Sequence, residues 1–242
     1  MFPLGMLVLT LLSEVQAGRI IGGHEAVPHS RPYMVLLGMY KFDGEKSWCG
    51  GFLLSEDFVM TAAHCQAKSY KVFLGLHNWH KLNDEVQQIP VEQEFPHKDY
   101  NPDGYVHDVM LLKLGTKAKI NDHVRTIALA NGDDGSLPKS CIVSGWGRME
   151  WANQMMSPKL LEINVTLIDD ENCAKENSYC STGMTGPGQG DSGGPLVCEG
   201  VKAYGVVSSM FEPRSDGMPL YKFAKISDYK DWIISTMKAA FM

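Results

Sequence analysis

GPGQGDSGGPLVC, residues 186–198, has five glycines and two prolines, which lead into a short apolar run. Glycine and proline weaken or break helices and central strands, so this segment is expected to be a loop that enters a strand. Asp191 and Ser192 lie in the middle of that loop. By itself, a serine among glycines is usually an ordinary loop residue.

Two other stretches contain the residue types that a reactive serine needs. TAAHC (61–65) places His64 beside a cysteine, and HDVMLLKL (107–114) places Asp108 ahead of an apolar run. Singly, the histidine could be structural and the aspartate a cap. Together they fit one chemistry, because a serine hydroxyl needs a base and the imidazole needs a carboxylate to hold its tautomer. The glycines around Ser192 would let backbone N–H groups approach an oxyanion.

GDSGG also satisfies the G-x-S-x-G pattern of the α/β-hydrolases. That fold alternates strands with helices and has the chain order Ser, Asp, His. Here the order is His64, Asp108, Ser192, and helical patterns are scarce. The α/β-hydrolase interpretation therefore fails.

Short β-like runs separated by turn residues dominate the chain and predict an all-β barrel or sandwich. The C-terminal stretch is an exception: its apolar residues share one helical face behind a cap at Ser227 or Asp228. The expected strands cover residues 33–37, 51–54, 58–61, 70–74, 109–114, 141–144, 161–167 and 203–208, with turns at 101–104 and 131–135.

The N-terminal segment and the cysteines indicate an exported protein. A net charge of -6 over 242 residues gives no support to nucleic-acid binding. The apolar run 4–12 is too short to span a bilayer, and with Val15-Gln16-Ala17 it predicts a signal peptide over 1–17, although an N-terminal strand is an alternative. The even number of cysteines, six, favours disulfides, whose spacing leaves 15 connectivities open. A zinc site is less favoured, because there is no Cys-x-x-Cys pair.

From Ile20 to about Met237 the sequence resembles the chymotrypsin-like serine proteases, within them the granzyme, chymase and cathepsin G group. The resemblance rests on IIGG (20–23), TAAHC, HDVMLLKL, SGWG (144–147), GDSGGPLVC and the terminal YKDWI. It implies an all-β fold of two six-stranded antiparallel β-barrels with a C-terminal helix, covering 20–242 and divided near 120–135.

The resemblance also implies a role for each motif residue. His64 is the base, Asp108 orients it, and Ser192 forms the acyl-enzyme. The N–H groups of Gly190 and Ser192 form the oxyanion hole. Removal of the dipeptide 18–19 frees the Ile20 ammonium to pair with Asp191; the activating protease stays open.

Disulfides Cys49–Cys65, Cys141–Cys198 and Cys173–Cys180 are implied in the same way. The resemblance further implies protein or peptide substrates, serpin-type inhibitors, a monomer, and secretion or storage in a secretory granule. No cofactor, metal, nucleic acid or membrane partner is expected. Asn164-Val165-Thr166 is an N-glycosylation acceptor.

The specificity pocket departs from the family. Gly186 falls at the pocket base where trypsin-like enzymes carry Asp, so cleavage after Lys or Arg is not expected. Met210 and Tyr221 replace residues that are usually smaller, and Gln189 lies at the rim. Ser208, Ser209 and Met210 are expected to pair with the substrate backbone. Two functions therefore stay open: a non-tryptic endopeptidase, or a protease-fold binding protein with an obstructed pocket.

Overall fold

The structure is a computed structural model that describes residues 20, 22–131, 136–138, 140–150, 153–211 and 217–242. The predicted signal peptide 1–17, the dipeptide 18–19 and most of the predicted turn at 131–135 lie outside the described residues. Strands dominate, so the all-β prediction is confirmed.

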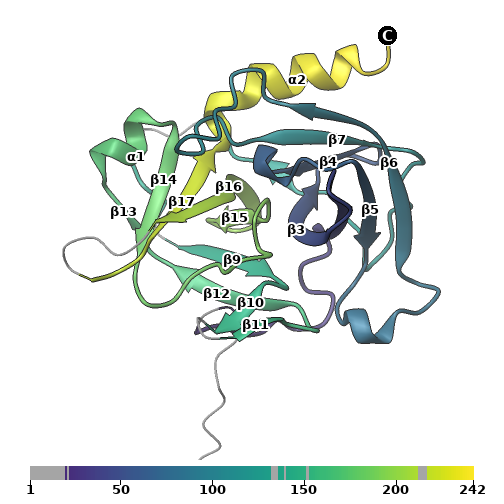
Figure 1. Cartoon of the computed structure of the whole chain (residues 1–242), viewed down its shortest axis with the longest axis horizontal. Helices are drawn as coiled ribbons and strands as arrows, with labels where there is room; N and C mark the ends of the chain where they lie inside the picture. The colour runs from purple at the N-terminus through teal and green to yellow at the C-terminus, as the bar shows by residue number, and fades with distance from the viewer. Residues whose placement is uncertain (1–19, 21, 132–135, 139, 151–152, 212–216) are drawn as a thin grey trace, which may run out of the picture.

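The first half of the molecule is a closed barrel of six strands in the order β2-β3-β4-β7-β6-β5 (Figure 1). Most of its strands coincide with the apolar runs of the sequence, because these side chains fill the barrel. The strands are β2 (Met34–Tyr40), β3 (Lys46–Leu53), β4 (Phe58–Thr61), β5 (Ser69–Leu74), β6 (Gln87–Pro96) and β7 (Met110–Leu114).

The second half is a nine-stranded sheet that contains the strands of the expected second barrel. Its order is β1-β12-β9-β15-β16-β17-β14-β13, and β8 pairs alongside β16. The six central strands, from β12 to β14, correspond to the expected barrel, and β1 and β13 extend the path at its ends. The strands are β1 (His24–Glu25), β8 (Ala128–Leu129), β9 (Cys141–Gly145), β12 (Leu161–Val165), β13 (Leu167–Ile168), β14 (Ser178–Thr182), β15 (Pro195–Cys198), β16 (Lys202–Phe211) and β17 (Leu220–Lys225).

Outside these two groups of strands the described elements are a separate hairpin, two α-helices and three 3-10 turns, of which the first two cover Ala63–Cys65 and Trp79–Lys81. The hairpin consists of β10 (Arg148–Glu150) and β11 (Asn153–Met156). The first helix, α1 (Glu171–Lys175), is short and is capped by Asp170, whose carboxylate accepts from the amides of Asn172 and Cys173.

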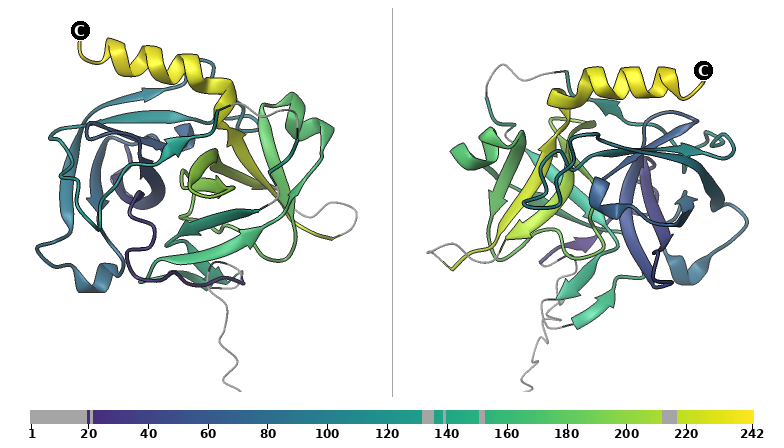
Figure 2. Two further views of the ribbon diagram at one scale, coloured as in Figure 1. Left: turned by 180° about the vertical axis from the view of Figure 1, so that it is seen from behind. Right: turned by 45° about the horizontal axis from the view of Figure 1, so that its top comes forward.

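The C-terminal helix links the two halves. A 3-10 turn (Ile226–Tyr229) follows β17, and α2 (Lys230–Ala239) then crosses toward the barrel, as Figure 2 shows from two further sides. Beyond α2, the Phe241 ring packs edge-on against Phe58 of β4, with centroids 5.7 Å apart. The predicted cap at Ser227 or Asp228 is wrong, because the 3-10 turn takes up those residues and α2 begins after Tyr229 without a side-chain cap.

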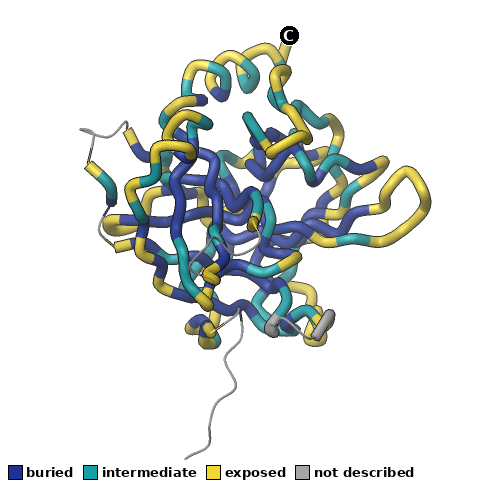
Figure 3. Tube along the Cα trace, turned by 60° about the vertical axis from the view of Figure 1, so that its left-hand side comes forward, coloured by how far each residue is buried: buried dark blue, intermediate teal, exposed yellow. Residues whose placement is uncertain are grey.

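Three disulfides join the cysteines in the pairs that the resemblance implies: Cys49–Cys65, Cys141–Cys198 and Cys173–Cys180. Buried residues follow the strands of both halves, whereas exposed residues gather in the connections (Figure 3). Within the described ranges no helix is both long and apolar enough to cross a membrane.

Candidate active site

His64 and Asp108 lie at the same edge of the barrel, because His64 follows the end of β4, Asp108 precedes the start of β7, and the two strands are antiparallel with Thr61 opposite Met110. His64 lies in a 3-10 turn directly after β4, and the Cys49–Cys65 disulfide ties that turn to β3. Asp108 lies two residues before the start of the apolar strand β7 and is fully buried. The Asp108 carboxylate binds His64 twice: Oδ2 lies 2.7 Å from the imidazole Nδ1, and Oδ1 accepts from the His64 amide at 2.8 Å.

A third donor reaches the same carboxylate from the second half of the molecule. The Ser208 hydroxyl, on β16, donates to Asp108 Oδ2 at 2.6 Å. Because three donors satisfy Asp108, the carboxylate is held in one orientation, and it in turn holds the imidazole in place. The sequence placed Ser208 only on the substrate strand, so this second role was missed.

Tyr105 packs against the His64 imidazole. Its ring meets the His64 imidazole edge-on, with centroids 5.3 Å apart. Tyr105 and His107 have φ values of 55° and 54°, a left-handed conformation that is uncommon for such residues and that clusters at functional sites. No motif indicated Tyr105; the loop that begins at Asn101 carries it over His64.

Ser192 lies in a tight loop held between the two halves. Its carbonyl accepts from the Gly50 amide at 2.7 Å, and the Gly193 amide donates to Val207 at 2.7 Å. Gly193 has φ of +83°, and an added Cβ would lie 2.5 Å from the Gly50 carbonyl. Gly190 has φ of +101° and likewise lies close to its neighbours. The glycines are therefore required by the close approach of backbone on which the Ser192 loop depends.

Asp191 points away from the cleft into the protein. Its carboxylate is fully buried and accepts from the Gly147 amide at 2.7 Å and the Gly188 amide at 2.8 Å. Burial raises the pKa of Asp191 from 3.8 to about 6, although the two amides partly oppose this rise. Ile20 is also fully buried, in the apolar cluster of the second sheet that includes Val143 of β9.

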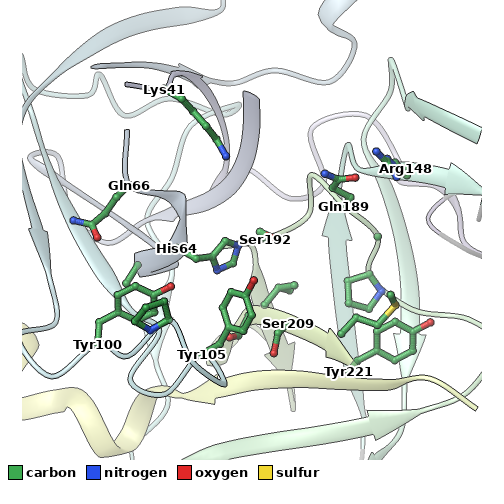
Figure 4. Close-up of a pocket in the computed structure, with 17 residues that line it drawn as sticks. Lys41, His64, Gln66, Tyr100, Tyr105, Arg148, Gln189, Ser192, Ser209 and Tyr221 are labelled. Atoms are coloured by element: carbon green, nitrogen blue, oxygen red, sulfur yellow. The ribbon is translucent and has the colours of Figure 1, made fainter. Parts of the chain in front are cut away.

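His64 and Ser192 open into one cleft of about 700 Å³ between the two halves. No hydrogen bond joins them in the described structure, and such bonds are often long in sites without substrate. Figure 4 shows Ser192 beside the His64 ring. Of the predicted substrate-binding residues, five line this cleft: Gln189, Ser208, Ser209, Met210 and Tyr221.

Gly186, the sixth predicted substrate-binding residue, is not among the residues that line the cleft. Tyr221 is fully buried and lies across Gly186, where an added Cβ would be 2.5 Å from the tyrosine Cζ. Burial raises the pKa of Tyr221 to about 12. Met210 keeps 42% of its surface exposed at the cleft. The floor of the cavity is therefore aromatic rather than open.

One edge of β16 stays open beside Ser192. On one side, Ser209 and Met210 pair with β17. On the other, β15 reaches only as far as Pro195 opposite Val206. Within the described ranges no strand pairs with that edge at residues 208–210, so an extended peptide could add there as a further strand.

Two other features of the sequence were a possible zinc site and an N-glycosylation acceptor. The ligand atoms of Cys49, His64 and Cys65 lie within 4.8 Å of one another, but the two sulfurs form a disulfide and offer no thiolate. Asn164 is exposed on β12, opposite Ile142 of β9.

A buried cation was also missed by sequence reasoning. Lys222 of β17 is 2% exposed, and its ammonium binds the Glu176 carboxylate and, at 3.0 Å, the Gly104 carbonyl. Gly104 directly precedes Tyr105, so Lys222 anchors the loop that covers His64.

Comparisons with known proteins agree with this architecture. The family model described as Trypsin matches residues 20–233. Granzyme B(G,H) of Mus musculus is 42% identical over 97% of this chain and 98% of its own length. Duodenase-1 of Bos taurus is 43% identical over 96% of this chain and 95% of its own length. A solved structure described as "Structure of GrC" superposes with a TM-score of 0.79 at 36% identity, covering 90% of this chain and 99% of that one.

Fold and site together define a chymotrypsin-like serine protease. The chain belongs to the trypsin family, and its relatives of the granzyme, duodenase and chymase type are serine endopeptidases.

Proposed function

We propose that this protein cleaves peptide bonds through His64, Asp108 and Ser192. The observation that carries the proposal is the contact of the fully buried Asp108 carboxylate with His64, through the His64 backbone amide and the imidazole Nδ1. His64 lines the same cleft as Ser192. His64 takes the Ser192 proton as Ser192 attacks the scissile carbonyl, and then gives that proton to the leaving amine as the C–N bond breaks and the acyl-enzyme forms. Water, deprotonated by His64, attacks the acyl-enzyme, and His64 returns the proton to Ser192 as the new carboxyl end of the substrate leaves. The Gly190 and Ser192 amides stabilise the oxyanion.

The direct test is cleavage of a peptide library by the chain that begins at Ile20. Replacing Ser192 or His64 by alanine is expected to lower kcat about 10⁴-fold or more, because the triad acts as a unit. Ser227→Ala changes a half-buried serine outside the cleft, is the matched control and should leave kcat unchanged. Cleavage that survives Ser192→Ala would refute the proposal.

Activation by release of Ile20 is part of the same proposal. Asp191 is a buried carboxylate that accepts from the neutral amides of Gly147 and Gly188, and a free Ile20 ammonium would give it a cationic partner. Pairing raises the pKa of that amine above its unfolded value of about 7.7–8. The ordered site is therefore expected to be lost, and activity to fall, as pH rises through the raised pKa.

The proposed specificity is non-tryptic. Tyr221 covers Gly186, and no described acidic side chain lines the cleft, so a lysine or arginine before the scissile bond finds no partner. Small or apolar side chains fit this aromatic floor.

An obstructed pocket favours a second candidate, a protease-fold binding protein with little peptidase activity. Its support is the same placement of Tyr221, together with Met210 at the cleft. In that case Ser192 reacts with a small serine-directed fluorophosphonate while no peptide in the library is cleaved.

Export to the cell exterior or a secretory granule is proposed from the predicted signal peptide and the three disulfides, which persist in oxidising compartments. Serpin-type inhibition, a monomeric state and glycosylation of the exposed Asn164 are proposed with it.

A further inference from the structure

A buried lysine joins the second half of the molecule to the loop beside His64. The ammonium of Lys222, on β17, binds the Glu176 carboxylate and, at 3.0 Å, the Gly104 carbonyl. Glu176 directly follows α1, whereas Gly104 lies between β6 and β7, in the segment 101–107 that we call the Tyr105 loop. A buried ammonium is costly unless it is paired and hydrogen-bonded, so Lys222 holds both partners close.

The sheet places Lys222 beside the strand that lines the cleft. Lys222 lies opposite Ser209 of β16, and residues directly opposite each other in an antiparallel pair share one face. Phe211, two residues after Ser209, lies on the same face, with its ring centroid 5.9 Å from the Lys222 ammonium. Since Lys222 also contacts Gly104, this face of the sheet packs toward the Tyr105 loop.

The shape of the Tyr105 loop needs support from outside the loop. Tyr105 has φ of 55°, a left-handed conformation that persists only where the surroundings enforce it. Two backbone hydrogen bonds between Asn101 and Val106, of 3.0 and 3.1 Å, close the base of the loop. The Lys222 contact falls at Gly104, inside that base and next to Tyr105. Lys222 therefore fixes the part of the loop that carries the tyrosine ring.

The Tyr105 ring forms one wall of the cleft. Its edge-on contact with the His64 imidazole has centroids 5.3 Å apart, and Tyr105 lines the cleft together with Ser192 and Ser209. In Figure 4, Tyr105 lies between the His64 ring and Ser209, and Tyr221 lies further along the cleft. In the proposed function, the side chain before the scissile bond lies over Tyr221. Because successive side chains of an extended peptide point to opposite faces, the one before it points away from Tyr221, toward Tyr105.

We propose that Lys222 is a positioning residue for substrate selection. Through Gly104 it holds the Tyr105 ring against His64, and the fixed ring restricts the second residue before the scissile bond to small side chains. The inference rests on the proposed endopeptidase function. Lys222 does not line the cleft, so it acts on the substrate through the Tyr105 loop.

The test uses the chain that begins at Ile20 and a peptide already found to be cleaved. Alanine or phenylalanine is placed two positions before the scissile bond, and the ratio of kcat/KM for phenylalanine to that for alanine is measured in one preparation. Lys222→Met keeps an apolar stem but removes the donor to Gly104. It should raise this ratio about 10-fold, because the shape of a pocket discriminates between side chains by factors of that order. Titration of Ser192 with a fluorophosphonate counts the folded, active chains.

Glu176→Gln separates positioning from stability. It removes the ion pair but leaves the Lys222 ammonium able to donate to the Gly104 carbonyl. It should therefore raise the ratio less than Lys222→Met does, although it costs more stability by leaving a buried charge unpaired.

Tyr105→Ala shows whether Lys222 acts through the tyrosine ring. This variant should raise the ratio at least as far as Lys222→Met, and adding Lys222→Met to it should change the ratio no further. The control is Lys225→Met, on the same strand as Lys222 and outside the cleft, which should leave the ratio unchanged.

A ratio that Lys222→Met leaves unchanged, or that it still raises in the Tyr105→Ala chain, would overturn the inference while peptide cleavage stands. So would a larger rise in Glu176→Gln than in Lys222→Met, because the ratio would then follow stability and Lys222 would be a structural residue alone. If Lys222→Met gives no titratable Ser192, the variant with both Lys222→Met and Glu176→Gln, which leaves no unpaired charge, replaces it with the same expected rise. If the library contains no cleaved peptide, the proposed endopeptidase function fails, and this inference fails with it.

Discussion

Asp191 gives the unprocessed chain a pH dependence that can be worked out from the structure. Its carboxylate is fully buried and accepts from the neutral amides of Gly147 and Gly188, and burial raises its pKa from 3.8 to about 6. A raised pKa means that the folded state binds the proton more tightly than the unfolded state. Its stabilising contribution is complete below the unfolded pKa and is lost as pH rises through the folded one.

The size of the effect follows from the shift. A change of about two pKa units corresponds to about 3 kcal/mol. The free energy of unfolding of the unprocessed chain is therefore expected to fall by up to about 3 kcal/mol between pH 4 and pH 7 through this group. Asp191→Asn should remove that fall. The substitution also turns one acceptor oxygen into an NH₂ group that faces a donor amide, which lowers stability at every pH by about 1–3 kcal/mol.

Urea unfolding at pH 4, 5, 6 and 7 measures the effect, in a Ser192→Ala background that prevents self-digestion. The control is Asp84→Asn, an exposed carboxylate that should leave the pH dependence unchanged. In the chain that begins at Ile20, the ammonium should lower the pKa of Asp191, so that its contribution is instead lost as pH falls. A pH dependence of the unprocessed chain that Asp191→Asn leaves intact would refute this reasoning.

Three further predictions concern the pocket and its supports. Tyr221→Gly should open the cavity floor and raise kcat/KM for phenylalanine relative to alanine before the scissile bond by about 10-fold or more, measured with matched peptides; an unchanged ratio would show that the ring does not limit the pocket. Glu176→Gln leaves the buried Lys222 ammonium without its carboxylate and should lower the free energy of unfolding by about 3 kcal/mol. This loss should exceed that of Lys222→Met, because Lys222→Met removes the buried charge whereas Glu176→Gln leaves it unpaired. Equal losses of the two variants in urea unfolding would contradict this. Gly193→Ala should destabilise by more than about 2 kcal/mol, because its φ is +83° and the new methyl would lie 2.5 Å from a carbonyl of β3, whereas Gly200→Ala, at φ of +96° in open space, reports the backbone strain alone.

Much of the barrel could be predicted because most of its strands are short apolar runs that are recognisable in the sequence. The expected run 58–61 coincides with β4, and 109–114 nearly coincides with β7. β6 was missed because Gln87–Pro96 is largely polar and contains two prolines. Its pairing depends on β5 and β7 on either side, and the irregular register between Val91 and Gln93 accommodates it. Such pairing is a tertiary effect that a single polar segment does not reveal.

Some residues of the candidate site could likewise be predicted from the sequence, and others could not. His64 and Asp108 lie in motifs with a stated chemistry, and the structure brings them into contact as that chemistry requires. Tyr105 and Lys222 lie in no motif. Only folding brings the Tyr105 loop beside His64 and places Lys222 of β17 against the Gly104 carbonyl of that loop. Tyr221 was placed at the pocket, but its position across Gly186 depends on side-chain packing that sequence spacing does not encode.

Covalent labelling of Ser192 tests the central claim most directly. The chain that begins at Ile20 and the unprocessed chain are each treated with a fluorophosphonate, and the modified residue is located by peptide mass spectrometry. The account predicts rapid labelling at Ser192 in the processed chain, loss of that labelling in His64→Ala, and little labelling before processing. A folded, processed chain that stays unlabelled, or one labelled equally with and without His64, would contradict it.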